Sequence, residues 1–366
     1  MKKIAFIVNS LGVGGAEKHT ITLANRLSVL GYSITIFVLK KNNDLLDEVD
    51  SKIKIKFLNI NKFYNKDTVN LINKECHDIG IEEIFCVNSY PLLYGYNAVK
   101  NTNIKCTIIH HTTELIGIKN KIKNIYLKKL MNKCNKRIFV SSNQRKYWIQ
   151  KYDICHENSY VIRNGVDVKK FTNLNNNLEV KKQLGITSKD LVITCSAMLR
   201  PEKNHIQLLK YIKELVNNGD SNVKLLLLGD GQERNSIEKY ILENKLKDNV
   251  ILLGKQKDVK KYYSISDLGV IASKAVETFS IAALEQMSMG IPMIMTNIGG
   301  ANEMVIDGFN GYLYELDDHL TFIKKIKELN EDREKLERLK INARFLVENT
   351  FSEQMMINEY VSFLEE

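Results

Sequence analysis

The chain of 366 residues is long enough for two domains, and its 44% hydrophobic and 26% charged residues are typical of a globular protein with a packed core. Three prolines and six cysteines without C-x-x-C spacing exclude long disordered linkers, a disulfide framework and a zinc site. The basic charge lies in one half: residues 1–170 carry 28 basic and 14 acidic side chains, whereas residues 171–366 carry 25 and 29, so the first half favours anionic surfaces or substrates.

Short apolar segments alternate with helix-length segments along the whole chain, beginning with a strand and not with a signal peptide. No apolar run is long enough to cross a membrane, and we expect a cytoplasmic protein. The predicted strands are 3–8, 33–39, 54–60, 83–89, 106–111, 137–142, 159–164, 191–198, 223–229, 250–254, 268–273, 292–297 and 311–315.

Strands that alternate with helices predict parallel sheets with right-handed crossovers. We therefore expect an α/β protein with two Rossmann-like domains that face each other across a cleft, residues 1–170 and 178–350. The polar run 173–177 is the expected linker. The charged segment 320–349 predicts a solvated surface helix, and a terminal helix at 352–366 is expected to pack back on the first domain.

Ligands of open α/β sheets bind beyond the carboxyl ends of the strands, so the loops there are searched first. The first such loop holds Gly12, Gly14 and Gly15 before a predicted helix, where backbone amides can approach a phosphate or a sugar. Glu17 occupies the third glycine position of the dinucleotide fingerprint, which disfavours a nicotinamide enzyme. Tight helix–strand packing is the alternative explanation.

Two further loops carry basic side chains. His110 and His111 end a strand, and one of them is expected to point toward the cleft, although a structural role remains open. Arg200, Lys203 and His205 follow the strand 191–198 and could stabilise a leaving diphosphate as a group of cations. A solvated turn is the alternative there.

The most specific pattern is Glu277, seven residues, and Glu285. The first acid precedes a helix and the second lies two turns into it, next to exposed amides around Phe279, Ser280 and Ile281 that form an anion site. One carboxylate can hold donor-sugar hydroxyls and the other a ribose diol. Glu285 lies among apolar residues and therefore needs a partner.

This E-x7-E segment, continuing into MGIPMIMTNIGGANEMV and DGFNGYLYE, resembles the donor-binding core of retaining family-4 glycosyltransferases of the GT-B fold. GGAEKH, SYVIRNGVD and LLLLGDGQER are similar to further motifs of that family in the same order. The resemblance implies a hexosyltransferase that moves a sugar from a nucleotide-sugar, here expected to be a UDP-sugar, with retention at the anomeric carbon.

The resemblance also implies roles for single residues. The donor-binding residues would be Gly14, Gly15, Gly254, Lys255, Phe279, Ser280, Ile281 and Glu285. The catalytic residues would be His111, Glu277, Lys203 and Arg200. Arg200 is included because Met198 stands where the family often has an arginine, and a nearby cation could replace it.

No two aspartates stand two residues apart, so the chain lacks a D-x-D motif, and we expect neither a metal nor another cofactor. Retention would follow from front-face attack, with the departing phosphate taking the acceptor proton. The acceptor is expected to be a glycan or a lipid-linked sugar of a bacterial surface polysaccharide, bound by loops around 60–70 and 90–125. The alternatives are a UDP-sugar 2-epimerase of the same fold and a basic nucleic-acid-binding protein, although the chain has no recognisable nucleic-acid-binding motif.

The segment 115–137 carries eight basic and no acidic residues, with apolar residues near helical spacing. This pattern predicts a basic amphipathic helix that attaches the protein to the anionic inner face of the cytoplasmic membrane. The alternative is a helix whose apolar face belongs to the core of the first domain.

Overall fold

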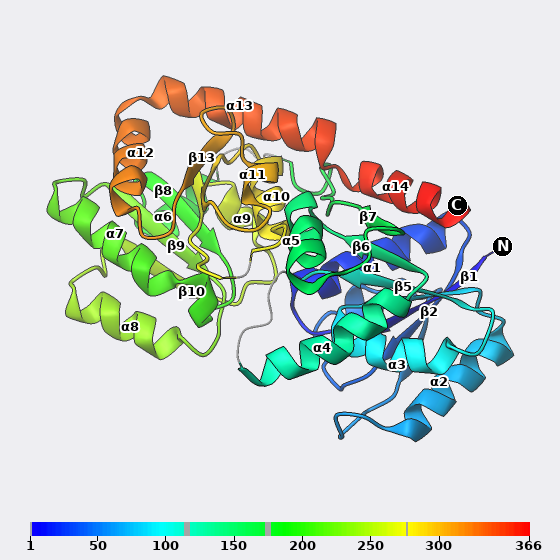
Figure 1. Ribbon diagram of the computed structural model, residues 1–366. Helices are drawn as coiled ribbons and strands as arrows, with labels where there is room; N and C mark the ends of the chain where they lie inside the picture. Colours follow the sequence, from blue (N-terminus) through cyan, green and yellow to red (C-terminus); the bar gives the residue numbers. More distant parts are fainter. Residues whose placement is uncertain (1, 113–117, 173–176, 276) are drawn as a thin grey trace. The chain divides into compact units, whose positions relative to one another are not determined.

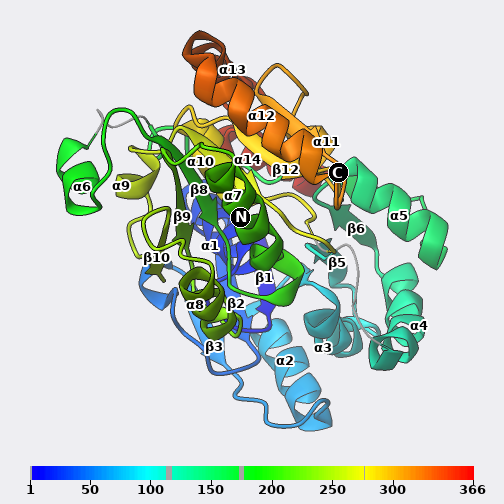
Figure 2. The same cartoon turned by 90° about the vertical axis from the view of Figure 1, so that its left-hand side faces the viewer.

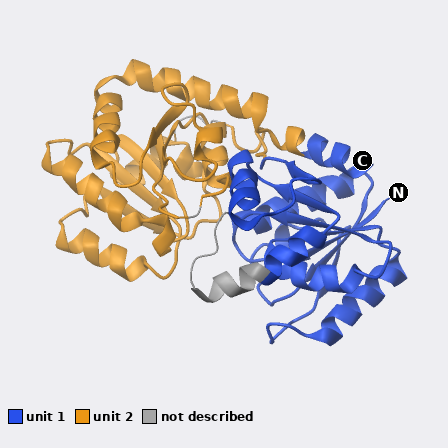
Figure 3. Cartoon of the chain, viewed as in Figure 1, with its two compact units in different colours: residues 1–164, 357–366 blue, residues 165–356 orange. Residues whose placement is uncertain are grey.

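The computed structural model describes residues 2–112, 118–172, 177–275 and 277–366, with the side chains of 118–125 left aside. It divides the chain into two compact units (Figure 3). Unit 1 comprises residues 1–164 and 357–366, and unit 2 comprises residues 165–356. The chain thus changes unit at 164/165, earlier than the segment 173–177 predicted as the linker, most of which lies outside the described residues.

Unit 1 is built around a seven-stranded parallel sheet of order β3-β2-β1-β4-β5-β6-β7 (Figure 1). Its strands are β1 (Lys3–Val8), β2 (Ser33–Val38), β3 (Lys54–Phe57), β4 (Glu83–Val87), β5 (Lys105–His110), β6 (Lys136–Phe139) and β7 (Ser159–Val161). Its helices are α1 (Gly15–Val29), α2 (Lys66–Ile79), α3 (Ser89–Val99), α4 (Ile118–Lys133) and α5 (Ser142–Tyr152). Helices cover both faces of a parallel sheet, and its central strands are accordingly buried and mostly apolar.

The last helix, α14 (Glu353–Glu365), begins in unit 2 and ends in unit 1. Its buried residues in unit 1 include Tyr360 and Phe363, which contact the ring of Phe85 on β4. Lys2 donates a 2.9 Å hydrogen bond to the backbone oxygen of Leu364, and Lys136 donates one of 3.1 Å to that of Phe363. Residues 357–366 are therefore part of the core of unit 1.

Unit 2 contains a six-stranded parallel sheet of order β10-β9-β8-β11-β12-β13. Its strands are β8 (Leu191–Ser196), β9 (Val223–Leu228), β10 (Val250–Gly254), β11 (Leu268–Ile271), β12 (Met293–Thr296) and β13 (Gly311–Tyr314). Its helices are α6 (Leu178–Gln183), α7 (His205–Asn217), α8 (Arg234–Glu243), α9 (Lys260–Tyr263), α10 (Ile281–Ser288), α11 (Ala301–Met304), α12 (His319–Glu331) and α13 (Arg333–Thr350). Apolar residues of α7, α8 and α12 form one core with the strands. Figure 2 labels these three helices in a second view.

The thirteen predicted strands are all present, and their ends move by at most three residues. The single surface helix predicted over 320–349 is wrong. Asp332 accepts a hydrogen bond from the amide of Lys335 and thereby caps a new helix, so the segment forms α12 and α13. Phe322 and Leu336 are among its fully buried residues, so only one side of each helix is solvated.

Each sheet has one point at which the strand order reverses, between β1 and β4 in unit 1 and between β8 and β11 in unit 2. The helices that follow the two strands at such a point lie on opposite faces of the sheet, which leaves a crevice at the carboxyl ends. Each unit therefore has one expected ligand position.

Candidate functional site

Lys203 and Glu277 form an ion pair beside the crevice of unit 2. Lys203 ends a 3-10 turn, Pro201–Lys203, that follows β8, and Glu277 lies between β11 and α10. The Nζ atom of Lys203 is 2.6 Å from Oε2 of Glu277, which also accepts a 2.7 Å hydrogen bond from Ser273 Oγ. Glu277 is only 7% exposed, so water screens the pair weakly.

The loops that hold this pair are fastened to each other by backbone hydrogen bonds. The amide of Lys274 donates to the oxygen of Glu202 at 2.9 Å, which joins the loop after β11 to the turn after β8. The amide of Gly300 donates to the oxygen of Glu277 at 3.2 Å. Gly299 has φ +58°, and a Cβ there would overlap the backbone oxygen of Glu277, so only glycine fits this position.

The N-terminus of α10 faces the same loop. Ser280 is the N-cap residue, and its Oγ accepts a 3.3 Å hydrogen bond from the amide of Ala283. The amide of Ile281 belongs to the first turn, where amides have no partner inside the helix. The ring of Phe279 is buried against Phe351, so the side chain belongs to the core and only its backbone could meet a ligand.

Glu285 lies two turns into α10 and is buried. Burial and the charge of Glu285 both raise the pKa of the Tyr263 hydroxyl far above its usual value, which indicates that the two side chains are neighbours. Tyr263 ends α9, twenty-two residues earlier in the chain. The expected partner of this buried carboxylate therefore includes a protein side chain.

Within the described residues, the side chains of Arg200 and His205 form no ion pair or hydrogen bond with Lys203 or Glu277. The guanidinium of Arg200 is half exposed, and its nearest nitrogen lies 3.9 Å from a carboxylate oxygen of Glu202. Arg200 lines a surface cavity of unit 2 together with Lys210 and Lys274. Burial, with a further contribution from Lys203, lowers the pKa of His205 to about 4. The expectation that His205 is a cation at neutral pH is wrong, because its ring is buried and neutral.

Gly254 and Lys255 lie at the end of β10, the edge strand of the same sheet. The backbone oxygen of Gly254 accepts a 2.9 Å hydrogen bond from the amide of Gly229 at the end of β9. Lys255 is exposed. Their contact with a base stays a prediction.

In unit 1 the two neighbouring histidines have different environments. The His110 ring packs edge-on against Trp148 at 4.4 Å, and neither ring nitrogen has a hydrogen-bond partner among the described residues. His110 is therefore a core residue. His111 follows β5, and its amide donates a 2.8 Å hydrogen bond to Asn88 Oδ1 after β4. Of the two, only His111 lies beyond the carboxyl edge of the sheet.

The rings of His111 and His19 of α1 are in contact, with their centroids 4.6 Å apart. Nε2 of His19 lies 3.3 Å from the hydroxyl oxygen of Tyr360 on α14. Burial lowers the pKa of His111 to about 4, and burial followed by the neighbouring His111 lowers the pKa of His19 well below its usual value. Both rings are neutral at pH 7. A neutral His111 can accept a proton or donate a hydrogen bond, but it cannot act as a cation.

Gly14 and Gly15 begin α1, with Gly14 as the N-cap residue. The carboxylate of Glu17 folds back over Gly14, where a Cβ would overlap it. An anion at this N-terminus would therefore meet a carboxylate, whereas a sugar hydroxyl could donate to it.

The described part of the basic segment 115–137 divides between two elements. Residues 115–117 and the side chains of 118–125 lie outside the described residues. Leu130 is buried in the core of unit 1, and Arg137 is buried on β6, where it donates to the backbone oxygens of Met131 and Cys134. The prediction that this segment is one helix up to Arg137 is wrong, since α4 ends at Lys133.

Sequence reasoning missed Ser273 and Tyr263, because neither is part of a recognised motif and the fold brings each of them to its carboxylate. Within the described residues, no group of three His, Cys, Asp or Glu side chains is arranged to hold a metal ion. A search of that same part of the chain finds no helix both long and apolar enough to cross a membrane.

Two doubly wound parallel sheets with a ligand crevice each define the class of two-domain α/β enzymes known as the GT-B fold. The solved structure of Anabaena Alr3699/HepE in complex with UDP matches the whole chain with a TM-score of 0.88, 20% identity and complete coverage of both chains. The glycosyltransferase from Rickettsia africae ESF-5 matches with a TM-score of 0.85 and 23% identity over 99% of this chain and 97% of its own.

The family model "Glycosyltransferase Family 4" matches residues 13–170, and the model "Glycosyl transferases group 1" matches residues 176–345. The chain therefore belongs to the family-4 glycosyltransferases, and it is a glycosyltransferase enzyme. An α-1,3-galactosyltransferase of Escherichia coli that acts with UDP-Gal on α-D-GlcNAc-diphosphoundecaprenol is 28% identical, over 86% of this chain and 84% of its own. The capsular polysaccharide biosynthesis glycosyltransferase CapM of Staphylococcus aureus is 28% identical over 66% and 65%.

Proposed function

We propose that the enzyme transfers a hexosyl group from a UDP-sugar to a lipid-diphosphate-linked or other glycan acceptor, with retention at the anomeric carbon, in the assembly of a bacterial surface polysaccharide. The names of the relatives from E. coli and S. aureus support the donor, the acceptor class and the process. The ion pair of Lys203 and Glu277 at the crevice of unit 2 is the observation that carries the proposal.

In this proposal Lys203 and the first-turn amides of α10 meet the negative charge that grows on the departing diphosphate. Glu277 accepts hydrogen bonds from hydroxyls of the donor sugar, and Glu285 binds the ribose diol. Ser273 holds the carboxylate of Glu277, and the 2.6 Å ion pair fixes the lysine in turn. Gly254 and Lys255 contact the base.

The transfer breaks the bond between the anomeric carbon and the diphosphate oxygen and forms a bond to the acceptor oxygen on the same face. The acceptor hydroxyl gives its proton to the departing phosphate oxygen, and UDP leaves. His111, neutral at pH 7, orients the reacting groups by hydrogen bonding. No divalent ion is part of this proposal, because the chain lacks a D-x-D motif and cationic and amide groups are available for the leaving group.

A UDP-release assay with UDP-glucose, UDP-galactose and UDP-N-acetylglucosamine in excess EDTA tests the donor, and adding a polyprenyl-diphosphate-linked sugar tests the acceptor. Acceptor-dependent UDP release that survives EDTA, with an α-linked product by NMR, supports the proposal. Activity that disappears in EDTA and returns with magnesium or manganese contradicts the metal-free route. An epimerised nucleotide-sugar formed without acceptor would instead indicate a 2-epimerase.

We further propose that unit 1 attaches to an anionic membrane surface, where a lipid-linked acceptor would be found. The exposed Lys129 and Lys133 and the 51% exposed ring of Tyr126 support this proposal, together with the excess of basic residues in 1–170. We expect more protein to sediment with anionic than with neutral vesicles at low salt, and less at high salt. Equal recovery on both vesicles would contradict the attachment.

A further inference from the structure

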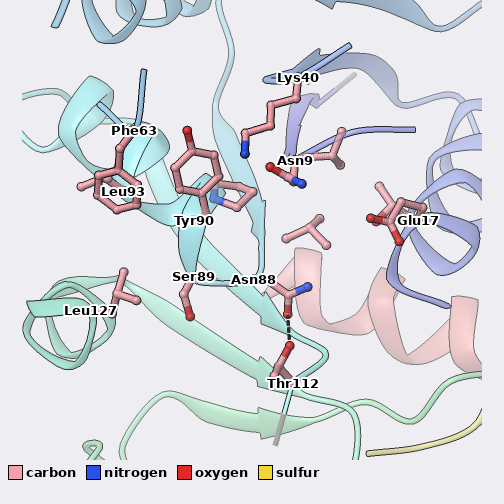
Figure 4. Close-up of a pocket in the computed structure, with 14 residues that line it drawn as sticks. Asn9, Glu17, Lys40, Phe63, Asn88, Ser89, Tyr90, Leu93, Thr112 and Leu127 are labelled. Carbon is pink, nitrogen blue, oxygen red and sulfur yellow. Dashed lines mark hydrogen bonds between the residues drawn. The ribbon is translucent and has the colours of Figure 1, made fainter. Parts of the chain in front are cut away.

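Figure 4 shows the cavity of unit 1, which is lined by Asn9, Asn88 and Thr112 beyond the carboxyl ends of β1, β4 and β5. Open α/β sheets bind their ligands at this position, so this cavity belongs to the glycosyl transfer proposed above. Unit 2 contains a different cavity, of about 550 Å³. Its described lining includes neither residue of the ion pair and none of the residues expected to bind the donor, and Arg200 is the one expected catalytic residue in it.

The first turn of α7 forms one wall of the unit 2 cavity. Asn204, the N-cap residue, and residues 205–207 after it all line the cavity. In the part of the chain that the structure describes, the amides of 205–207 donate to no acceptor, and the Asn204 side chain does not cap them. The positive end of the helix dipole is therefore available to an anion.

Two buried polar side chains of α7 line the same cavity without hydrogen-bond partners. His205 is 3% exposed, and neither of its ring nitrogens has a partner among the described residues. Tyr211 is 5% exposed, and its hydroxyl is unpartnered within the same part of the chain. Buried polar groups are almost always hydrogen-bonded, so these two side chains indicate that a ligand completes the site.

Three cationic side chains line the cavity, and their charge is only partly balanced. Arg200 begins the turn that leads into α7, and the amide of Lys274 donates a 2.9 Å hydrogen bond to the backbone oxygen of Glu202 in that turn. Lys210 lies on α7, where side chains lean toward the N-terminus of the helix. Within the described chain, Lys210 and Lys274 have no carboxylate at ion-pair distance. Positive charge therefore gathers at the N-terminus of α7, a combination that binds a phosphoryl group.

Two carboxylates in the lining show that the ligand also carries hydrogen-bond donors. Glu233 and Asp317 line the cavity, and Asp317 accepts a 2.5 Å hydrogen bond from Nε2 of Gln207. A bare anion would meet these carboxylates without a donor, whereas the hydroxyls of a sugar can donate to them. The volume agrees, because pockets for small organic molecules measure about 300–1,000 Å³, which is far more than one inorganic ion fills.

We propose that this cavity is a second ligand site of the enzyme, which binds a phosphorylated sugar that is neither the donor nor the acceptor. The phosphoryl group accepts hydrogen bonds from the α7 amides and the His205 ring and is paired with Lys274 and Arg200. The sugar hydroxyls donate to Glu233 and Asp317. A neutral sugar would leave the uncapped amides and the cations without a ligand.

Calorimetric titration tests this site with three probes: ribose 5-phosphate, ribose and inorganic phosphate. Saturating UDP is present throughout, so that the nucleotide site of unit 2 is occupied and cannot bind the probes. We expect ribose 5-phosphate to bind more tightly than either other probe, because it alone uses both the cations and the carboxylates. K274A should weaken ribose 5-phosphate and inorganic phosphate about tenfold, as for the loss of one hydrogen bond to a charged group.

The control is K239A, which changes an exposed lysine of α8 that does not line the cavity and should leave all three affinities unchanged. NMR of the histidine side chains gives a second measurement. Ribose 5-phosphate, but not ribose, should shift the ring nitrogen signals of His205, which are identified by their loss in H205N. The surface variant K274A decides the question if H205N does not fold.

Three results would overturn the site while UDP binding persists: equal binding of ribose and ribose 5-phosphate, equal effects of K274A and K239A, or no binding of any probe. Absence of UDP binding would instead contradict the proposed function, since the probes of the second site do not depend on it.

Discussion

Replacing Lys203 tests whether this residue stabilises the charge of the leaving diphosphate or merely belongs to a solvent-exposed turn. Lys203→Ala removes the cation and leaves Ser273 as the remaining side-chain partner of the buried Glu277 carboxylate among the described residues. We expect kcat/KM to fall by about two to three orders of magnitude. The free energy of unfolding should fall by on the order of 1–3 kcal/mol, the cost of an unpaired buried group.

Steady-state kinetics and urea unfolding measure these two effects. Lys239→Ala is the control, because its side chain is 73% exposed on α8 and, among the described residues, pairs only with Glu243, at 3.7 Å. A Lys203 variant with normal kcat/KM would contradict the role. Arg200→Ala gives a separate answer: if activity is unchanged, Arg200 does not replace the arginine that is missing at Met198.

The two acids of the E-x7-E segment should differ in what they bind. Glu285→Gln removes the charge that the ribose diol would use and should weaken UDP binding by about tenfold or more, since a hydrogen bond to a charged group contributes about 1.5–3 kcal/mol. Glu277→Gln should lower turnover with a smaller loss of affinity for free UDP. Calorimetry with UDP and kinetics with the UDP-sugar measure the two effects, and unchanged UDP affinity in the Glu285 variant would contradict the assignment.

At the scale of elements, the strands could be predicted because parallel strands buried on both faces are continuous apolar runs. The helix break at Asp332 was missed, because the charged pattern continues across it and only the cap geometry ends α12. The pairing of Lys203 with Glu277 could not be read from the sequence either. Seventy-four residues separate them, and a 3-10 turn and a loop set the 2.6 Å contact.

Gly299 offers a test of how the loop after β12 supports Glu277. Gly299→Ala would impose φ +58° on alanine, at roughly 1–2 kcal/mol, and would also drive the Cβ into the backbone oxygen of Glu277. Gly185→Ala is the matched control, since Gly185 has φ +65° but open space around its Cβ position. We expect the Gly299 variant to lose more unfolding free energy than the control and also activity. Equal losses in urea unfolding would show that the loop moves aside.

At the scale of the whole molecule, residues from the first and the last helix of the chain pack against each other inside unit 1. The hydroxyl of Tyr360 on α14 lies beside His19, and His19 packs against His111. Sequence reasoning predicted the terminal helix but not this chain of contacts, because 341 residues separate Tyr360 from His19. Together with His110, the rings of His19 and His111 give unit 1 three neutral histidines.

These histidines should make the protein sensitive to mild acid. Burial lowers the pKa of His111 to about 4, and burial followed by His111 lowers the pKa of His110 to about 3 and that of His19 well below its usual value. In the unfolded chain each histidine has a pKa of about 6.5, so below that pH the unfolded state binds protons that the folded state cannot. The free energy of unfolding is therefore highest above pH 7. It falls as the pH decreases toward 4, by up to about 1.4 kcal/mol per pH unit for each histidine.

Urea unfolding between pH 7.5 and 5 measures the slope of the free energy of unfolding against pH. His110→Leu should reduce it by one histidine, whereas His77→Asn, which changes an exposed side chain, should leave it unchanged. A free energy of unfolding that stays constant from pH 7 to pH 5 would show that the buried rings accept protons in the folded state.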